Sequence, residues 1–201
     1  MRQATALAMM AVVGISLPAL PALARELGNE VTGNWAGTAA DGFWFRAQLE
    51  TQADLAALKI WNGMGAVPDR SDAPELDVAD FAVAAFATSQ RLEVIETPDS
   101  STLQVITEFA DEEGEGREVV EIRYIDSQYT IVGYALEASF QGFDGPAEET
   151  QCVVDTLAGR VVENGRMRNL PPLDHAALNA SGWGEAAAFE RGWCSRSGEA
   201  G

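Results

Sequence analysis

Four side chains in two neighbouring segments have the types that small-molecule pockets use. They are Trp44, Arg46, Lys59 and Trp61. Such pockets combine aromatic walls with one or two polar anchors that orient the ligand. If the segments are β-strands, alternation places the four on the face opposite Phe45 and Ile60. They then either line a cavity or face outward as a contact patch, and ordinary packing beneath the proline-rich segment that follows, or beneath the C-terminal tail, is the simplest alternative. We take these four as the candidate ligand-binding residues.

The single histidine gives little support for catalysis. His175 stands beside Asp174 and near Ser181, but a serine hydrolase presents its nucleophile on a G-x-S-x-G elbow, and the sequence has no such motif. Asp174 follows two prolines, where an aspartate most simply caps a short helix. The Gly-Glu-Gly at 114–116 is interpreted as a hairpin turn and not as a phosphate-binding loop. We therefore expect no catalytic residues.

Carboxylates gather in the segment 69–80, whose acids are Asp69, Asp72, Glu75, Asp77 and Asp80. Calcium binds clustered carboxylates, but this spacing differs from the D-x-D-x-D-G loop with its distal glutamate. A solvated acidic loop is the favoured interpretation, and calcium binding stays open. One histidine and two cysteines are too few for a zinc or iron–sulfur site, so we expect no metal and no cofactor.

The composition is that of an acidic globular protein. The chain of 201 residues has 13 basic and 31 acidic side chains, a net charge of −18, and 47% apolar residues. Disordered chains of such charge contain far fewer apolar residues. The negative charge repels phosphate, which argues against nucleic acid and anionic lipid as partners. The length suits one domain with an appendage, and the oligomeric state is left open.

Residues 1–24 have the features of a secretory signal peptide. Arg2 precedes an apolar run over 4–17, and Ala22-Leu23-Ala24 supplies the small-x-small cleavage pattern. A membrane anchor is disfavoured because the run is shorter than the ~20 residues that span a bilayer. Lys59 is the only lysine among 13 basic residues, a bias that we take to indicate GC-rich bacterial coding. We predict export to the periplasm or the medium, with no membrane span in the mature chain.

Export to an oxidising compartment allows the pairing state of the two cysteines to be predicted. Cys152 and Cys194 are the only cysteines, and an oxidising compartment favours a disulfide between them. A redox pair is the alternative, but the two are not arranged as C-x-x-C. The predicted bond would tie the C-terminal tail back to the last long strand.

Alternation with a period of two dominates the chain between residues 43 and 170. We expect strands at 43–50, 56–61, 81–87, 91–96, 103–109, 120–124, 129–140, 151–162 and 167–170, with a turn-rich loop over 62–77. Asn164-Gly165 is the strongest hairpin signal, because a type I′ turn needs positive φ at both central residues. These patterns predict an all-β fold: an antiparallel up-and-down barrel of about eight strands over 25–170, followed by a short helical tail over 171–201.

The triplet Gly33-Asn34-Trp35 opens a further expected strand, the first in the chain, which precedes the segment 43–50. This G-x-W pattern resembles that of the calycins, the lipocalin and avidin-like barrels, and small periplasmic protease-inhibitor barrels carry a similar tryptophan. The resemblance implies that Trp35 packs across the closed end of a barrel, while Gly33 allows close backbone approach. Trp35 would then be structural. A last strand tied by a disulfide to a C-terminal tail also looks lipocalin-like.

These observations together favour an exported, non-enzymatic binding protein that holds a small apolar or amphipathic ligand inside a β-barrel. The alternative is a protein-binding module of the envelope, either a hydrolase inhibitor or an assembly factor, which would use the loop 62–80 as its contact. An enzyme ranks last, because no catalytic constellation is visible.

Overall fold

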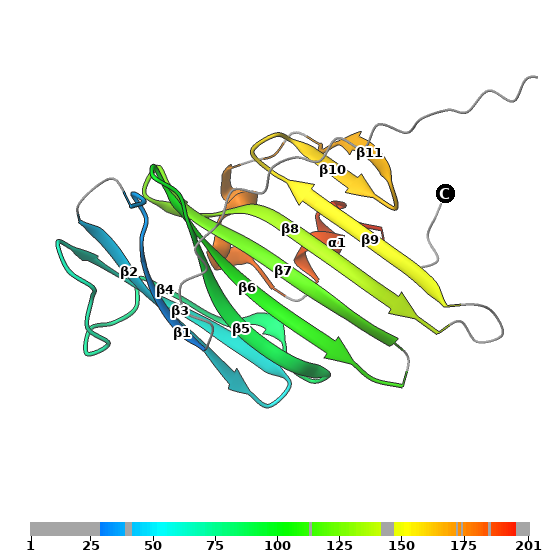
Figure 1. Cartoon of the computed structure of the whole chain (residues 1–201), viewed down its shortest axis with the longest axis horizontal. Helices are drawn as coiled ribbons and strands as arrows, with labels where there is room; N and C mark the ends of the chain where they lie inside the picture. Colours follow the sequence, from blue (N-terminus) through cyan, green and yellow to red (C-terminus); the bar gives the residue numbers. More distant parts are fainter. Residues whose placement is uncertain are drawn as a thin grey trace, which may run out of the picture.

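A computed structural model describes residues 29–38, 42–112, 114–141, 147–171, 173, 175–184 and 186–195. The predicted signal peptide, residues 1–24, lies outside the described residues, as does Asp174, the predicted helix cap. The described part is built from antiparallel strands arranged in two sheets, with a short C-terminal tail (Figure 1). The predicted all-β, antiparallel class is therefore confirmed.

The small sheet contains the first four strands in sequential order. They are β1 (Glu30–Asn34), β2 (Phe43–Gln52), β3 (Leu55–Met64) and β4 (Leu76–Val83). The large sheet contains the other seven, also as sequential neighbours. They are β5 (Ala87–Glu96), β6 (Ser101–Ala110), β7 (Gly114–Ile125), β8 (Gln128–Phe140), β9 (Glu148–Asp155), β10 (Arg160–Glu163) and β11 (Arg166–Asn169).

The described strands form two separate sheets, and no closed barrel is found among them. The sheets approach each other where the chain after β1 meets the β5–β6 turn: the Thr38 amide donates to the Thr97 carbonyl at 3.0 Å, and the Ser101 hydroxyl to the Asn34 carbonyl at 2.6 Å. At the other side, strands β4 and β11 do not pair with each other. The C-terminal tail lies there and contributes Ala180, Trp183 and Trp193 to the common core.

The core lies between the facing sides of the two sheets. Phe45 of β2 and Ile60 of β3 are fully buried in it, together with Val94 and Ile122 of the large sheet. Alternation along β2 and β3 therefore directs Trp44, Arg46, Lys59 and Trp61 to the opposite side of the small sheet. The sequence left the choice of face open, and the structure makes that face the outer one.

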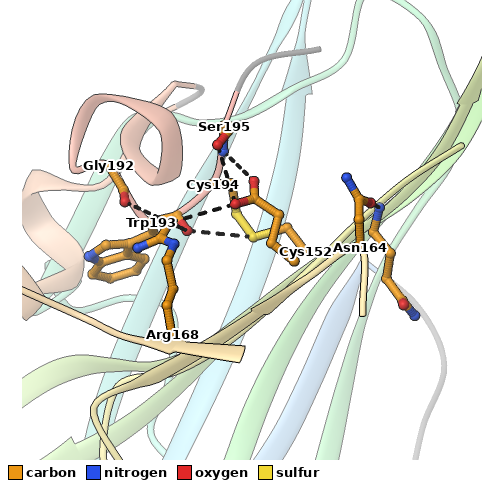
Figure 2. Close-up of a disulfide and its surroundings, with 9 residues drawn as sticks. Cys152, Asn164, Arg168, Gly192, Trp193, Cys194 and Ser195 are labelled. Atoms are coloured by element: carbon orange, nitrogen blue, oxygen red, sulfur yellow. Dashed lines mark hydrogen bonds and ion pairs between the residues drawn. A yellow bond between two sulfur atoms is a disulfide. The ribbon is translucent and has the colours of Figure 1, made fainter. Parts of the chain in front are cut away.

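The tail consists of two 3-10 turns, η1 (His175–Leu178) and η2 (Ala180–Gly182), and the short helix α1 (Ala187–Glu190). The predicted disulfide is present and joins Cys152 of β9 to Cys194, with the Cα atoms 6.0 Å apart. Around it, the Arg168 guanidinium donates to the carbonyl of Trp193 at 2.7 Å, and the Ser195 amide donates to the Glu163 carboxylate at 2.5 Å (Figure 2). The tail is thus fastened covalently and by polar contacts to strands β9 to β11.

Inside the tail, a cation and two indoles form one cluster. The Arg191 guanidinium lies 5.0 Å from the ring centre of Trp183 and 5.3 Å from that of Trp193, and it donates to the Gly182 carbonyl at 2.8 Å. Both tryptophans are buried. They anchor the tail against the inner face of the large sheet, where Trp183 lies against Tyr134 of β8.

Candidate functional site

The four predicted ligand-binding residues lie on the outer face of the small sheet. Arg46 and Trp61 are direct cross-strand partners, while Trp44 and Lys59 lie further along the same pair of strands. Residues 65–75 form a loop that returns over this face. The structure therefore brings these four residues together on one side of one hairpin.

Three of these four side chains are held by hydrogen bonds or ion pairs with other residues of the chain. The Trp61 indole is 6% exposed and donates to the Asp72 carbonyl at 2.8 Å. Arg46 donates to the Pro68 carbonyl at 3.0 Å and pairs with Glu30, and the Lys59 ammonium is 2.7 Å from the Glu50 carboxylate. This arrangement matches the alternative of packing beneath the proline-rich loop, and a role of these residues in ligand binding stays a prediction.

The other sequence candidates are dispersed. In the acidic segment, the Asp69 carboxylate accepts from the Ser71 amide, and Glu75 accepts from Asn62 and Tyr129. Within the described ranges, no three His, Cys, Asp or Glu residues gather as they would to hold a metal ion. The side chain of His175 is outside the described part, so its prediction stays untested.

A cavity of about 410 Å³ opens at one end of the sandwich, where the inner face of the large sheet meets β4 and α1. Four phenylalanines from four different segments line it: Phe86 before β5, Phe109 of β6, Phe140 of β8 and Phe189 of α1. Its other lining residues are Val83, Ala87, Thr107, Asp111, Gly114, Glu118, Tyr134, Leu136 and Ala186. We call this space the phenylalanine cavity.

Two glycines of β7 make room for two of these rings. The register places Gly116 opposite Phe109, and Gly114 opposite Phe140. A Cβ on Gly116 would lie 2.5 Å from the end of the Phe109 ring, and one on Gly114 would lie 3.0 Å from Phe140 Cδ1. The interpretation of 114–116 as a hairpin turn is only partly correct. The turn ends at Gly114, whose carbonyl accepts from the Asp111 amide at 2.9 Å, whereas Gly116 lies within β7 and allows close approach by Phe109.

Glu118 and Tyr134 contribute a carboxylate and a phenol to the cavity wall, whose other polar lining residues are Thr107 and Asp111. Glu118 of β7 pairs in register with Thr107 and Leu136, so its side chain belongs to the inner face. The Tyr134 hydroxyl, on a side chain 2% exposed, forms a hydrogen bond with Glu118. Burial raises the pKa of Tyr134 above its ordinary value, and the nearby charge of Glu118 raises it further. This pair is missed by sequence reasoning, since nothing marks Glu118 among 31 acids.

Tyr129, which lies in the same core, also has a raised pKa, chiefly through burial and then through the charge of Glu75. We expect both tyrosines to stay protonated in the folded protein above pH 10.0, their ordinary pKa, where the unfolded chain loses these protons. The folded state then binds more protons than the unfolded state, so the free energy of unfolding falls as the pH rises past 10.0.

Urea unfolding at neutral and alkaline pH measures this fall, and tyrosinate absorbance follows the ionisation directly. The urea-unfolded protein, in which all three tyrosines are free to titrate, is the control. Ionisation of all three near pH 10.0 in the folded protein would contradict the burial of Tyr129 and Tyr134.

A larger depression of about 910 Å³ lies on the other face of the large sheet. Its lining is mostly polar and includes Glu108, Arg117, Glu137 and Gln151. Ligand pockets are predominantly apolar with a few polar groups. The phenylalanine cavity fits that description better, and it is our candidate site.

Comparison with protein-family models, curated proteins and solved structures finds no match for the chain. The resemblance to calycins through Gly33 and Trp35 therefore stays a prediction. No helix in the described residues is long and apolar enough to cross a membrane.

Proposed function

We propose that the protein is an exported, non-enzymatic binding protein that holds a small apolar or amphipathic ligand in the phenylalanine cavity. The observation that carries this proposal is the wall itself, which combines four phenylalanine rings with the carboxylate of Glu118 and the phenol of Tyr134. A volume of about 410 Å³ falls within the range of small-molecule sites. The disulfide between Cys152 and Cys194 is compatible with an oxidising compartment outside the cytoplasm.

The exposure of the rings supplies a driving force for binding. Phe86 is 58% exposed, and the other three rings are partly buried. A ligand that removes about 300 Å² of apolar surface from water gains roughly 7 kcal/mol, from which the cost of association must be subtracted. Since 7 kcal/mol without that cost corresponds to a dissociation constant of roughly 10 μM, we expect simple apolar probes to bind more weakly than this, with dissociation constants on the order of millimolar.

The polar groups that face the cavity support a role in ligand binding and not in catalysis. Glu118 and Tyr134 share a hydrogen bond, and burial keeps the Tyr134 phenol in its neutral form. A carboxylate held in this way is suited to orienting a bound molecule.

Replacement of Ala87 with phenylalanine should fill the cavity from the β5 wall and weaken binding of N-phenyl-1-naphthylamine, a neutral fluorescent probe, at least tenfold. The cause is steric, because Ala87 lines the cavity and is partly buried. The matched control is Thr88→Phe, since Thr88 is the next residue, is exposed, and lines the depression on the opposite face. Fluorescence titration of the two variants and the unmodified protein measures the difference.

Equal probe affinity in the two variants would place the binding elsewhere and overturn the proposal. Failure of the unmodified protein to bind any apolar probe would also overturn it. The protein-binding alternative would then take its place, and deletion within the loop 65–75 would be its first test.

A further inference from the structure

The last strand of the large sheet leaves one edge open. β11 ends the strand order of that sheet and pairs with β10 on one side only (Figure 1). All of its residues, Arg166–Asn169, are exposed. Its other side therefore presents backbone hydrogen-bonding groups that have no strand partner among the residues that the structure describes.

The hydrogen bonds of the hairpin show which backbone groups these are. The Leu170 amide, directly after β11, donates to the Gly159 carbonyl at 2.9 Å. Because hydrogen-bonded positions alternate along an antiparallel pair, every second residue of β11 directs its backbone groups toward β10. The residues between them, Met167 and Asn169, direct their amides and carbonyls toward the open edge.

Positive charge gathers at this edge of a strongly acidic chain. The segment 157–170 contains Arg160, Arg166 and Arg168 but only one acid, Glu163, so its net charge is 3 − 1 = +2, against −18 for the whole chain. Glu163 lies 3.8 Å from Arg168. Arg160 and Arg166 form no ion pair with any described residue. The edge therefore has positive charge to offer to a carboxylate.

We propose that β11 is a docking edge for an extended, acidic segment of a partner protein, which adds to the large sheet as an antiparallel strand. The segment forms main-chain hydrogen bonds with Met167 and Asn169 and places carboxylates beside Arg166. Strand addition of this kind takes its affinity from the main chain and its specificity from alternate side chains. The edge is separate from the phenylalanine cavity, so the inference goes beyond the proposed function.

The side chains around the edge define the pattern of the partner. Met167 is 68% exposed and lies opposite Val162, which lies opposite the exposed Val153. A partner residue that pairs with Met167 extends this apolar row on the outer face. Its neighbours along the strand point to the other face, where Arg166 and Arg168 lie. A segment that alternates apolar and acidic residues therefore fits the edge.

A second copy of the chain fits this edge less well. Antiparallel pairing of two β11 strands through Met167 and Asn169 has two registers. Either register sets an arginine of one copy directly opposite an arginine of the other, and like charges in that position are destabilising. The same arginines that oppose self-pairing attract an acidic strand.

A capped seven-residue peptide that alternates valine with glutamate is the probe, and the same peptide with lysine in place of glutamate is the charge control. NMR titration of the isotope-labelled protein follows both. We expect the amide signals of Met167 and Asn169 to move downfield as these amides donate to the peptide. We expect the glutamate peptide to bind about tenfold more tightly than the lysine peptide.

N-methylated peptides separate strand addition from simple charge attraction. A valine that pairs with Met167 directs its amide toward β11, whereas the neighbouring glutamates direct theirs away. N-methylation of the valines should therefore weaken binding about tenfold, and N-methylation of the glutamates should weaken it far less.

Arg166→Glu should weaken binding of the glutamate peptide about tenfold and improve binding of the lysine peptide. The matched control is Arg117→Glu, because Arg117 is also exposed, has no ion pair with a described residue, and lies on β7, four strands from β11. This control should keep the affinity of the unmodified protein.

Equal binding of the glutamate and lysine peptides, or equal losses in Arg166→Glu and Arg117→Glu, would overturn the acidic partner. Equal losses with the two N-methylated peptides, or no binding of the glutamate peptide, would overturn strand addition. Shifts of Met167 and Asn169 that depend on protein concentration without peptide would assign the edge to a second copy instead. The proposed function is tested separately, since N-phenyl-1-naphthylamine reports on the phenylalanine cavity and not on β11.

Discussion

Replacement of both Cys152 and Cys194 with alanine lowers the free energy of unfolding by up to about 4 kcal/mol. This is the expectation of the chain-entropy account of disulfides for a pair separated by 42 residues. The bond fastens the segment that carries Trp193, which is fully buried, and α1, which forms one wall of the phenylalanine cavity. Release of the tail would therefore weaken both the core and the cavity.

Urea unfolding followed by tryptophan fluorescence measures the effect. Alanine is used at both positions because serine would bury a hydroxyl at Cys152, which is fully buried. The control is the unmodified protein with its disulfide reduced, which should show a similar loss. A loss of less than about 1 kcal/mol in both would contradict the role of the bond as the main fastening of the tail.

Replacement of Gly33 with valine is expected to destabilise the fold by about 3 kcal/mol, at the upper end for overpacked cores. A Cβ at Gly33 would lie 2.6 Å from Cε1 of Phe45 and 2.9 Å from Cγ1 of Val94, so it would enter the core between the two sheets. Phe45 has no room to retreat, because it is fully buried and stacks on Trp35 with ring centres 3.9 Å apart.

Gly182→Ala is the matched control, because no atom lies within 4 Å of a Cβ at that position and the tail turn there is exposed. Thermal and urea unfolding of the two variants should differ clearly. A second variant, Gly33→Val with Phe45→Leu, should recover part of the loss by shortening the side chain that the valine meets. Unchanged stability of Gly33→Val would contradict close packing between β1 and the two sheets.

Most strand positions could be predicted from the sequence because alternation is a local property. Two predictions were wrong: 151–162 is not one strand but the antiparallel pair β9 and β10, and 81–87 runs from the end of β4 to the start of β5. The segment 103–109 lies within β6, 129–140 within β8, and the Asn164-Gly165 turn joins β10 to β11 with φ values of 48° and 75°. The disulfide followed from counting cysteines. The first strand was misplaced, since Gly33 lies near the end of β1 and Trp35 follows it.

Closure of the sheet could not be predicted, because it depends on contacts between distant segments. The same hairpin pattern suits a barrel or two packed sheets. Trp183 and Trp193 from the tail occupy the core beside β4 and β8. The alternation pattern of the strands does not predict this burial. Burial of the tail then favours two open sheets over a closed one.

The phenylalanine cavity could not be predicted from the sequence for a related reason. Its four rings come from four segments, and each alone is an ordinary apolar residue of a strand, a turn or a short helix. The glycines that admit Phe109 and Phe140 resembled a turn, because glycine is common in both settings. Trp44 and Trp61 gave a stronger local signal, but the structure packs Trp61 beneath the loop 65–75.

NMR chemical-shift mapping during titration with decanol tests the central claim most directly, because it reports where a neutral ligand binds. The account predicts saturable shifts at backbone amides around the phenylalanine cavity, at Ala87, Phe109, Gly114 and Phe189. The indole signals of Trp44 and Trp61 on the outer face of the small sheet should stay in place. Shifts confined to those two indoles, or no saturable shift at any cavity amide, would contradict the account.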